Sequence, residues 1–282
     1  MGPGPGSGSS FASPIVPGDR CTAGRRPHAR RPTPATASAI SASIAPVAAD
    51  QDPGLITPSA SETIADVIAR MEQIDGELPR KDGVAYFNRL YLQVTKAVQA
   101  AAASITFADP DFTQRLDVVF AGLYFAAEAT VGTGATCPIA WRPLVEERSA
   151  DRAPIQFAIV GMNAHINHDL PIALVQTCRE LGAAPEDGSP EHADYQRVNG
   201  ILADVEGQVA GWFETGLIAD IVDVTPADVD NALAMWSIAD ARDLAWEHAK
   251  LLWRLRHYPS LADAYGDVLA RLVELSGRGI LV

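Results

Sequence analysis

The sequence predicts an all-α protein, a single bundle of about eight helices preceded by a disordered N-terminal tail. From about Thr57 onward, apolar residues recur three and four positions apart, which is the spacing of one helix face. Capping residues and prolines stand at the starts of these segments. No alternating apolar runs flank an Asn-Gly or Asp-Gly pair, so no hairpin is indicated. We therefore expect one all-α domain over residues 56–282.

The tail, residues 1–55, consists mostly of Gly, Pro, Ser, Ala and Arg. It has no hydrophobic periodicity and too little apolar surface to offset the entropy of ordering, so we expect it to be disordered. Arg30 and Arg31 precede a mild stretch over 37–49, a loose likeness to a twin-arginine export signal. Its Ser, Thr and Pro content is unlike a continuous secretory segment, and a cytoplasmic location is the favoured expectation.

The first three helices each begin at a recognisable cap. Ser59 and Glu62 form a capping-box pattern before the first helix. Asp82 precedes the second helix, and Asp109 followed by Pro110 opens the third. Each cap is followed by large apolar residues along one stripe, which predicts a buried helix face.

Five further helices are expected in the second half of the chain. Thr225 caps the longest of them, and Pro259 ends it. Their expected ranges, in chain order, are 140–148, 154–181, 191–215, 225–257 and from 260 onward, with apolar residues recurring as far as Leu275.

Composition excludes several classes of function. The 282 residues carry a net charge of −13, and residues 1–50 hold five arginines against two aspartates, so the acidic excess lies in the helical part. Binding to nucleic acid or to an anionic membrane surface needs a basic protein face, so the negative net charge argues against both partners. The three cysteines are scattered, which indicates neither a disulfide framework nor a cysteine zinc site. No apolar run reaches the length of a transmembrane helix.

Polar residues are concentrated in the middle of one otherwise apolar segment, 155–177. At about 100° per residue, His165 and Asp169 lie about 40° apart, and His168 lies about 60° to the other side of His165. These three side chains therefore share one helix face. Asn163 and Asn167 lie close to the opposite face. Buried polar groups each cost about 1–3 kcal/mol when unpaired, so both clusters require partners or a ligand.

One interpretation of this cluster is a metal site. His165, His168 and Asp169 project from neighbouring turns and could bind a divalent ion, Zn²⁺, Mn²⁺ or Mg²⁺. A carboxylate from the third helix, Asp117 or Glu128, would complete it. The alternative is a satisfied structural network in which the asparagines bind backbone on adjacent helices. Pro171 frees the backbone carbonyl of Asn167 as a further acceptor.

A second informative helix carries Arg242 inside its apolar arc. An inward arginine requires an anion, and its planar fork suits a carboxylate or a phosphate. Asp169 is the obvious internal partner, in a structural bridge. The functional alternative is a clamp for an anionic substrate. Trp141, which follows a Gly-rich loop, is expected either in the core or at the rim of a pocket.

Several segments together resemble the DUF5995 family, which is abundant in actinobacteria and has no settled activity. The most specific is GMNAHIN followed by HDL within 161–170. The resemblance implies one helical domain and points to Asn163, His165, Asn167 and Asp169 as the family signature, in which the position of His168 is less restricted. The segments that carry it are 87–95, 107–127, 140–148, 157–175, 194–206 and 241–253.

Three functions remain open. The first is a small-molecule enzyme, a metal-dependent hydrolase or lyase, with His165, Asp169 and Arg242 as catalytic residues. The second is an isoprenoid-like apolar-ligand enzyme or binder in which Arg242 clamps an anion. The absence of a DDxxD-type aspartate run counts against a diphosphate substrate. The third is a non-catalytic helical module whose buried polar network only specifies packing.

Overall fold

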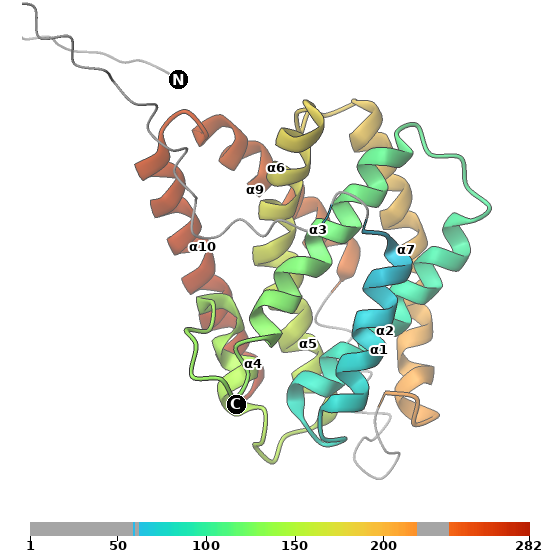
Figure 1. The fold of residues 1–282 in the computed structure, drawn as a ribbon, viewed down its shortest axis with the longest axis vertical. Coiled ribbons are helices and arrows are strands. Elements are labelled where there is room, and N and C mark those ends of the chain that lie inside the picture. Colours follow the sequence, from blue (N-terminus) through green and yellow to red (C-terminus); the bar gives the residue numbers. More distant parts are fainter. Residues whose placement is uncertain (1–58, 60–61, 219–236) are drawn as a thin grey trace, which may run out of the picture. The chain divides into compact units, whose positions relative to one another are not determined.

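The computed structural model describes residue 59 and residues 62–218 and 237–282, all within one unit, Gln51–Val282 (Figure 1). In this part of the chain every regular element is helical, which confirms the all-α prediction. The predicted tail and the predicted cap at Thr225 lie outside the described residues. The elements are α1 (Ile64–Glu77), α2 (Gly83–Ala102), α3 (Pro110–Glu128), η1 (Ile139–Trp141), α4 (Arg142–Glu147), α5 (Pro154–Ala164), η2 (His165–Asp169), α6 (Leu170–Leu181), α7 (Pro190–Glu214), α9 (Ile238–Leu255) and α10 (Pro259–Ile280).

Two of the predicted helix starts are confirmed, and the first is wrong by a few residues. The Asp82 side chain accepts the N–H of Val84 at 2.8 Å, and Asp109 accepts that of Phe112 at 3.0 Å. The first capping box, however, joins Thr63 and Asp66, not Ser59 and Glu62. Asp66 stands at the third helical position and accepts the Thr63 N–H at 2.9 Å, so the helix begins at Ile64.

The predicted continuous helix from Thr225 to His257 is also wrong. Ser237 has an extended backbone and caps a new helix, because its hydroxyl accepts the N–H of Asp240 at 3.3 Å. The helix that contains Arg242 is therefore α9, which begins at Ile238.

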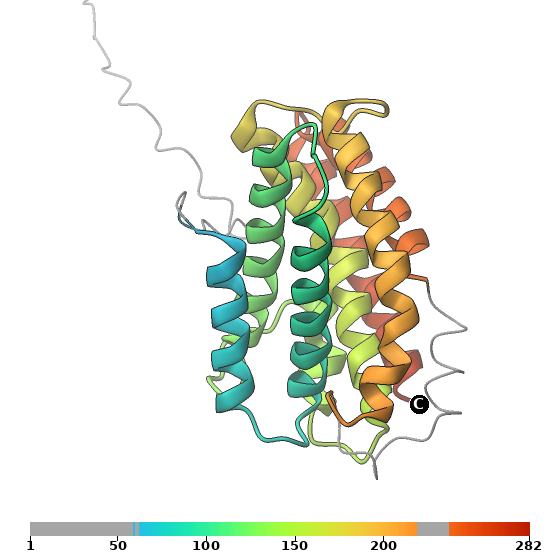
Figure 2. The ribbon, with the colours of Figure 1, turned by 90° about the vertical axis from the view of Figure 1, so that its right-hand side faces the viewer.

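A central rod made of α5, η2 and α6 runs through the bundle, as Figures 1 and 2 show. It contacts α2, α3, α9 and α10. The predicted helix over 154–181 is thus confirmed with one change, a π-helical turn over His165–Asp169. In this turn the N–H of Leu170 reaches back five residues to the carbonyl of His165. Pro171 has no N–H to donate to the carbonyl of Asn167, so the regular ladder is already broken at this point.

The rod and α2 approach each other closely at Gly161. A Cβ atom on Gly161 would lie 2.3 Å from the ring of Phe87, so only glycine allows this contact. Phe87 is fully buried and packs edge-on against Tyr124 and Trp141. The close contact fixes the position of α2 relative to the polar middle of the rod.

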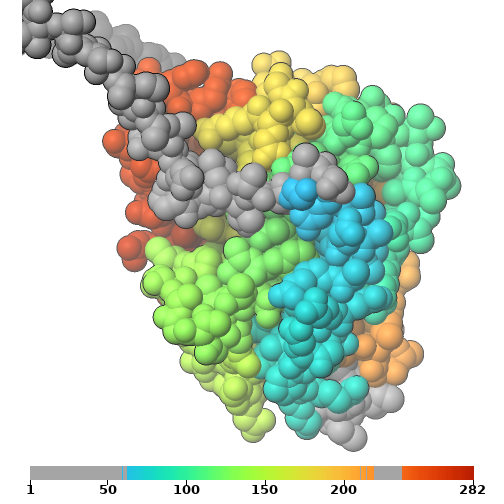
Figure 3. Space-filling view, in the orientation of Figure 1, coloured from blue at the N-terminus to red at the C-terminus, as the bar shows by residue number. Residues whose placement is uncertain are grey.

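On the surface, α1 lies beside α3 and covers one side of the bundle (Figure 3). The last helix, α10, leaves several large apolar side chains exposed, among them Leu261, Val268, Leu272 and Leu275. None of the described helices has both the length and the apolar character needed to cross a lipid bilayer.

Candidate functional site

The polar middle of the rod divides into two faces, as the sequence predicts. On one face, the side-chain amide of Asn163 donates to the backbone carbonyl of Val273 at 3.0 Å. Asn167 in turn donates to the side-chain oxygen of Asn163, also at 3.0 Å. These bonds tie the rod to α10. Asn163 thus binds backbone on an adjacent helix, as the second interpretation of this cluster expects, whereas Asn167 binds the side chain of Asn163.

On the opposite face, Asp169 is the centre of a second network. One carboxylate oxygen accepts the indole N–H of Trp141 at 2.9 Å and lies 3.4 Å from Nδ1 of His165. The other lies 2.7 Å from Nδ1 of His168. Burial alone would raise the pKa of Asp169, but the bonds from His165 and His168 outweigh it and hold the pKa below its usual value. Asp169 is thus an ionised carboxylate with protein partners on both oxygens, and Trp141 is a core residue.

The expected metal site is not supported by this geometry. Among the described residues, no three His, Cys, Asp or Glu side chains are placed to hold an ion together. Both histidines turn Nδ1 toward the same carboxylate rather than toward a shared point. His165, His168 and Asp169 therefore do not converge on one point where an ion could bind.

The two third-helix carboxylates that were expected to complete it do not join His165, His168 and Asp169 in a group that could hold an ion, among the described residues. Glu128 forms an ion pair with Arg70 of α1 at 3.4 Å. Tyr124 is completely buried and donates its hydroxyl to Asn88 at 3.0 Å. Asp117 instead lines a cavity.

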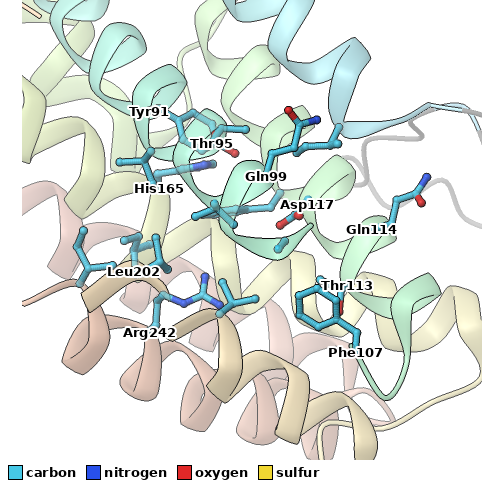
Figure 4. Close-up of a pocket in the computed structure, with 18 of the residues that line it drawn as sticks. Tyr91, Thr95, Gln99, Phe107, Thr113, Gln114, Asp117, His165, Leu202 and Arg242 are labelled. Atoms are coloured by element: carbon cyan, nitrogen blue, oxygen red, sulfur yellow. The ribbon is translucent and has the colours of Figure 1, made fainter. Parts of the chain in front are cut away.

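This cavity has a volume of about 220 Å³ and mostly apolar walls, contributed by α1, α2, α3, the rod, α7 and α9 (Figure 4). Gln99 and Gln114 are exposed and mark its solvent side, whereas Phe120 and His165 are buried at its inner side. Its lining residues are Ile64, Tyr91, Val94, Thr95, Val98, Gln99, Ala102, Phe107, Pro110, Thr113, Gln114, Asp117, Phe120, Met162, His165, Ile166, Val198, Leu202, Ile238 and Arg242. The sequence did not reveal the cavity, because its walls come from six parts of the chain.

His165 lies next to Asp169 and also lines the cavity. Its ring stacks on Phe120 with centroids 3.5 Å apart and meets Tyr91 edge-on at 4.5 Å. Burial lowers the pKa of His165, against the opposing effect of Asp169, so the imidazole is neutral near pH 7. In the described part of the chain Nε2 is buried without a hydrogen-bond partner.

Arg242 points inward, as its position on the helix wheel predicts, and is only 6% exposed. Its Nε donates to the side-chain oxygen of Asn199 at 2.6 Å, and its guanidinium lies 4.3 Å from the ring centre of Tyr195. No carboxylate of the described residues lies within 4.0 Å of it, so the direct bridge to Asp169 is wrong. Asp169 is already held by Trp141 and the histidines. Asn199 and Tyr195 were not singled out in the sequence, because they lie on another helix, more than 40 residues before Arg242.

Asp117 is the second charged group on the cavity wall. It has no hydrogen-bond or ion-pair partner among the residues that the structure describes. Burial raises the pKa of its carboxyl group to about 6, against the opposing effect of Arg242. Burial likewise raises the pKa of Tyr91 well above 10, and the charges of Asp117 and Asp169 add to this effect. The cavity therefore combines apolar walls with one cation, one weakly acidic carboxyl group and a neutral phenol.

Comparison with known proteins gives a family and nothing more specific. Neither a curated protein nor a solved structure matches the chain. A sequence model described as a family of unknown function, DUF5995, matches residues 64–282, which include every described helix and the whole cavity. The chain therefore belongs to the DUF5995 family.

Proposed function

We propose that this protein binds an apolar small molecule carrying one carboxylic acid group, with the acid at Arg242 and the apolar body along the cavity wall. The observation that carries this proposal is a buried guanidinium that borders an apolar cavity and has no anionic partner in the described chain.

The energetics of buried charges support an anionic ligand. A buried guanidinium is stable only when its hydrogen bonds and its charge are matched. Asn199 satisfies Nε, and the ring of Tyr195 stabilises one face. The remaining donors form a planar fork, and a carboxylate matches this fork with two parallel hydrogen bonds. The neutral partners thus hold the side chain in place without neutralising it.

The size of the cavity limits the ligand. A cavity of about 150 Å³ holds a benzene molecule, so by proportion about 220 Å³ holds roughly nine carbon atoms. A longer chain would extend past Gln99 and Gln114 into solvent (Figure 4). Medium-chain fatty acids and aryl or terpenoid acids have this size and polarity.

The other functions have weaker support. A metal-dependent hydrolase or lyase would need ligands around Asp169, whose two oxygens already have protein partners. A purely structural role accounts for the asparagines and for Asp169. It does not account for the cavity or for the unpaired charges of Arg242 and Asp117.

The proposal is tested by calorimetric titration of delipidated protein with octanoate, decanoate and dodecanoate, and with octan-1-ol and decan-1-ol as uncharged controls. We expect the acids to bind at least tenfold more tightly than alcohols of equal length. Arg242→Gln should remove this preference. Arg256→Gln is the matched control, because Arg256 also lies on an aromatic ring, Trp253, at 4.3 Å but does not line the cavity.

Equal affinity for acids and alcohols in the unmodified protein would contradict the proposal even if Arg242→Gln failed to fold. A loss of the preference in Arg256→Gln as well would show that the effect is not specific to the cavity.

A further inference from the structure

We propose that Asp117 determines which ligands the cavity accepts, by holding a proton that it shares with the bound acid group beside Arg242. Binding of a carboxylate then takes up one proton from solution. This inference rests on the proposed function and assigns to Asp117 a role in specificity.

The first observation is the placement of the two charges. Asp117 of α3 and Arg242 of α9 line the same cavity, and Figure 4 shows both side chains directed into it. They are not an ion pair, since no oxygen of Asp117 lies within 4.0 Å of the guanidinium nitrogens in the described structure. A ligand group placed at Arg242 therefore enters a space that Asp117 also faces.

The second observation is that few other charges act on Asp117. The titratable groups that share the cavity are Tyr91 of α2 and His165 of η2, and both are neutral near pH 7. Behind His165 lies Asp169, which is ionised. From α1 and α7 the cavity wall receives only the apolar side chains Ile64, Val198 and Leu202.

Several other charged groups on the helices around α3 form ion pairs within the protein, namely Arg70 with Glu128, Arg115 with Glu180 and Arg197 with Asp194. On α9, Asp243 accepts a hydrogen bond from Asn199, the residue that also binds Arg242. The charged group that acts on the pKa of Asp117 is Arg242, so we infer that Asp117, Arg242 and the ligand set the charge balance of the cavity.

That balance leads to proton uptake. With Asp117 ionised, the empty cavity carries one negative and one positive charge. A bound carboxylate would add a second negative charge within an apolar space, where like charges repel strongly. One shared proton removes the excess, as in other pairs of carboxyl groups that occupy one site. The cost is small near neutral pH, because burial already raises the pKa of Asp117 to about 6.

Two properties of binding follow. Affinity for a monocarboxylate should rise by up to about tenfold for each unit by which the pH falls from 8 to 6, because each binding event takes up a proton. The site should also reject dianions such as alkyl phosphates, because one proton leaves them with excess negative charge at Arg242.

The test is a calorimetric titration of the intact chain with decanoate at pH 6, 7 and 8, in two buffers that differ in ionisation enthalpy. For the unmodified protein we expect affinity to fall at least thirtyfold from pH 6 to pH 8, and a buffer-dependent heat that corresponds to uptake of close to one proton at pH 8. Asp117→Asn carries a permanently neutral side chain of the same shape. It should bind decanoate with the same affinity at all three pH values, as tightly as the unmodified protein at pH 6.

Decanoate binding that is unchanged between pH 6 and pH 8 in the unmodified protein would overturn the role of Asp117 while leaving the proposed function intact. The same holds if Asp117→Asn keeps the pH dependence or binds more weakly. No decanoate binding at any pH would overturn the proposed function, and this inference with it.

Discussion

Two polar regions lie side by side in the core of this protein, and they differ in how their charges are satisfied. In the rod, Asn163, Asn167 and Asp169 each form hydrogen bonds to the protein. In the cavity, Arg242 has only neutral partners, and Asp117 has none in the described chain. The comparison shows that a polar residue in an apolar helix is not by itself a sign of function. What distinguishes the two regions is whether the protein supplies the partner.

The largest expected effect comes from making the same substitution in both regions. Asp169→Asn replaces an acceptor by a donor next to the indole N–H of Trp141 and the ring of His168, so we expect a loss of about 3 kcal/mol in the free energy of unfolding. Asp117→Asn breaks no hydrogen bond of the described chain and removes the charge of a half-buried carboxyl group, so we expect a change of less than about 0.5 kcal/mol or a gain in stability. Urea unfolding of both variants measures the difference.

Equal losses in the two variants would remove the distinction between a structural carboxylate and a cavity carboxylate. A large loss in Asp117→Asn alone would mean that Asp117 has a partner within the protein.

The two carboxyl groups should also give opposite dependence of stability on pH. The pKa of Asp117 is raised from 3.8 to about 6 in the folded state, so the folded protein binds this proton more tightly than the unfolded chain. Its contribution to stability is therefore full below about pH 4 and is lost as the pH rises through 6, by up to about 3 kcal/mol for a pKa raised by about two units. The pKa of Asp169 is lowered, so its contribution is present above pH 4 and is lost as the pH falls through the folded-state value.

Unfolding curves measured between pH 3 and pH 8 test these two opposite dependences of stability on pH. As the pH rises from 4 to 6, the free energy of unfolding of Asp117→Asn should increase relative to that of the unmodified protein. As the pH falls below 4, the stability that Asp169→Asn loses relative to the unmodified protein should become smaller. Parallel curves for both variants would contradict the assigned directions.

A smaller effect is expected from Asn163→Ala. The substitution leaves the carbonyl of Val273 and the side chain of Asn167 without their partner, which we expect to cost about 1–2 kcal/mol. Decanoate binding should not change, because Asn163 does not line the cavity. A variant that is stable but no longer binds decanoate would show that the two regions are coupled.

Much of the fold could be predicted from the sequence because it depends on local signals. Asp82 and Asp109 mark helix starts through bonds that span two or three residues. The first capping box was misplaced because two such patterns, 59–62 and 63–66, follow each other directly, and the structure uses Thr63 and Asp66. The break before Ile238 was missed because the apolar periodicity continues through it.

The site was predicted only in part, since its partners are distant in sequence. The helix wheel placed Arg242 inward and put His165 and Asp169 on one face, and both predictions are confirmed. The wheel could not show that Asp169 binds Trp141, or that Arg242 binds Asn199. These pairs depend on how separate helices pack. No single segment of the sequence predicts the cavity, because residues from several helices line it.

The most direct test of the central claim is a crystal structure of the protein with 10-bromodecanoate, in which anomalous scattering locates the bromine atom. The account predicts the carboxylate within hydrogen-bond distance of the Arg242 guanidinium and the bromine toward the solvent side of the cavity, near Gln99 and Gln114. A bromine peak beside His165, with the carboxylate in solvent, or a peak only outside the cavity, would contradict the claim that Arg242 anchors an apolar acid.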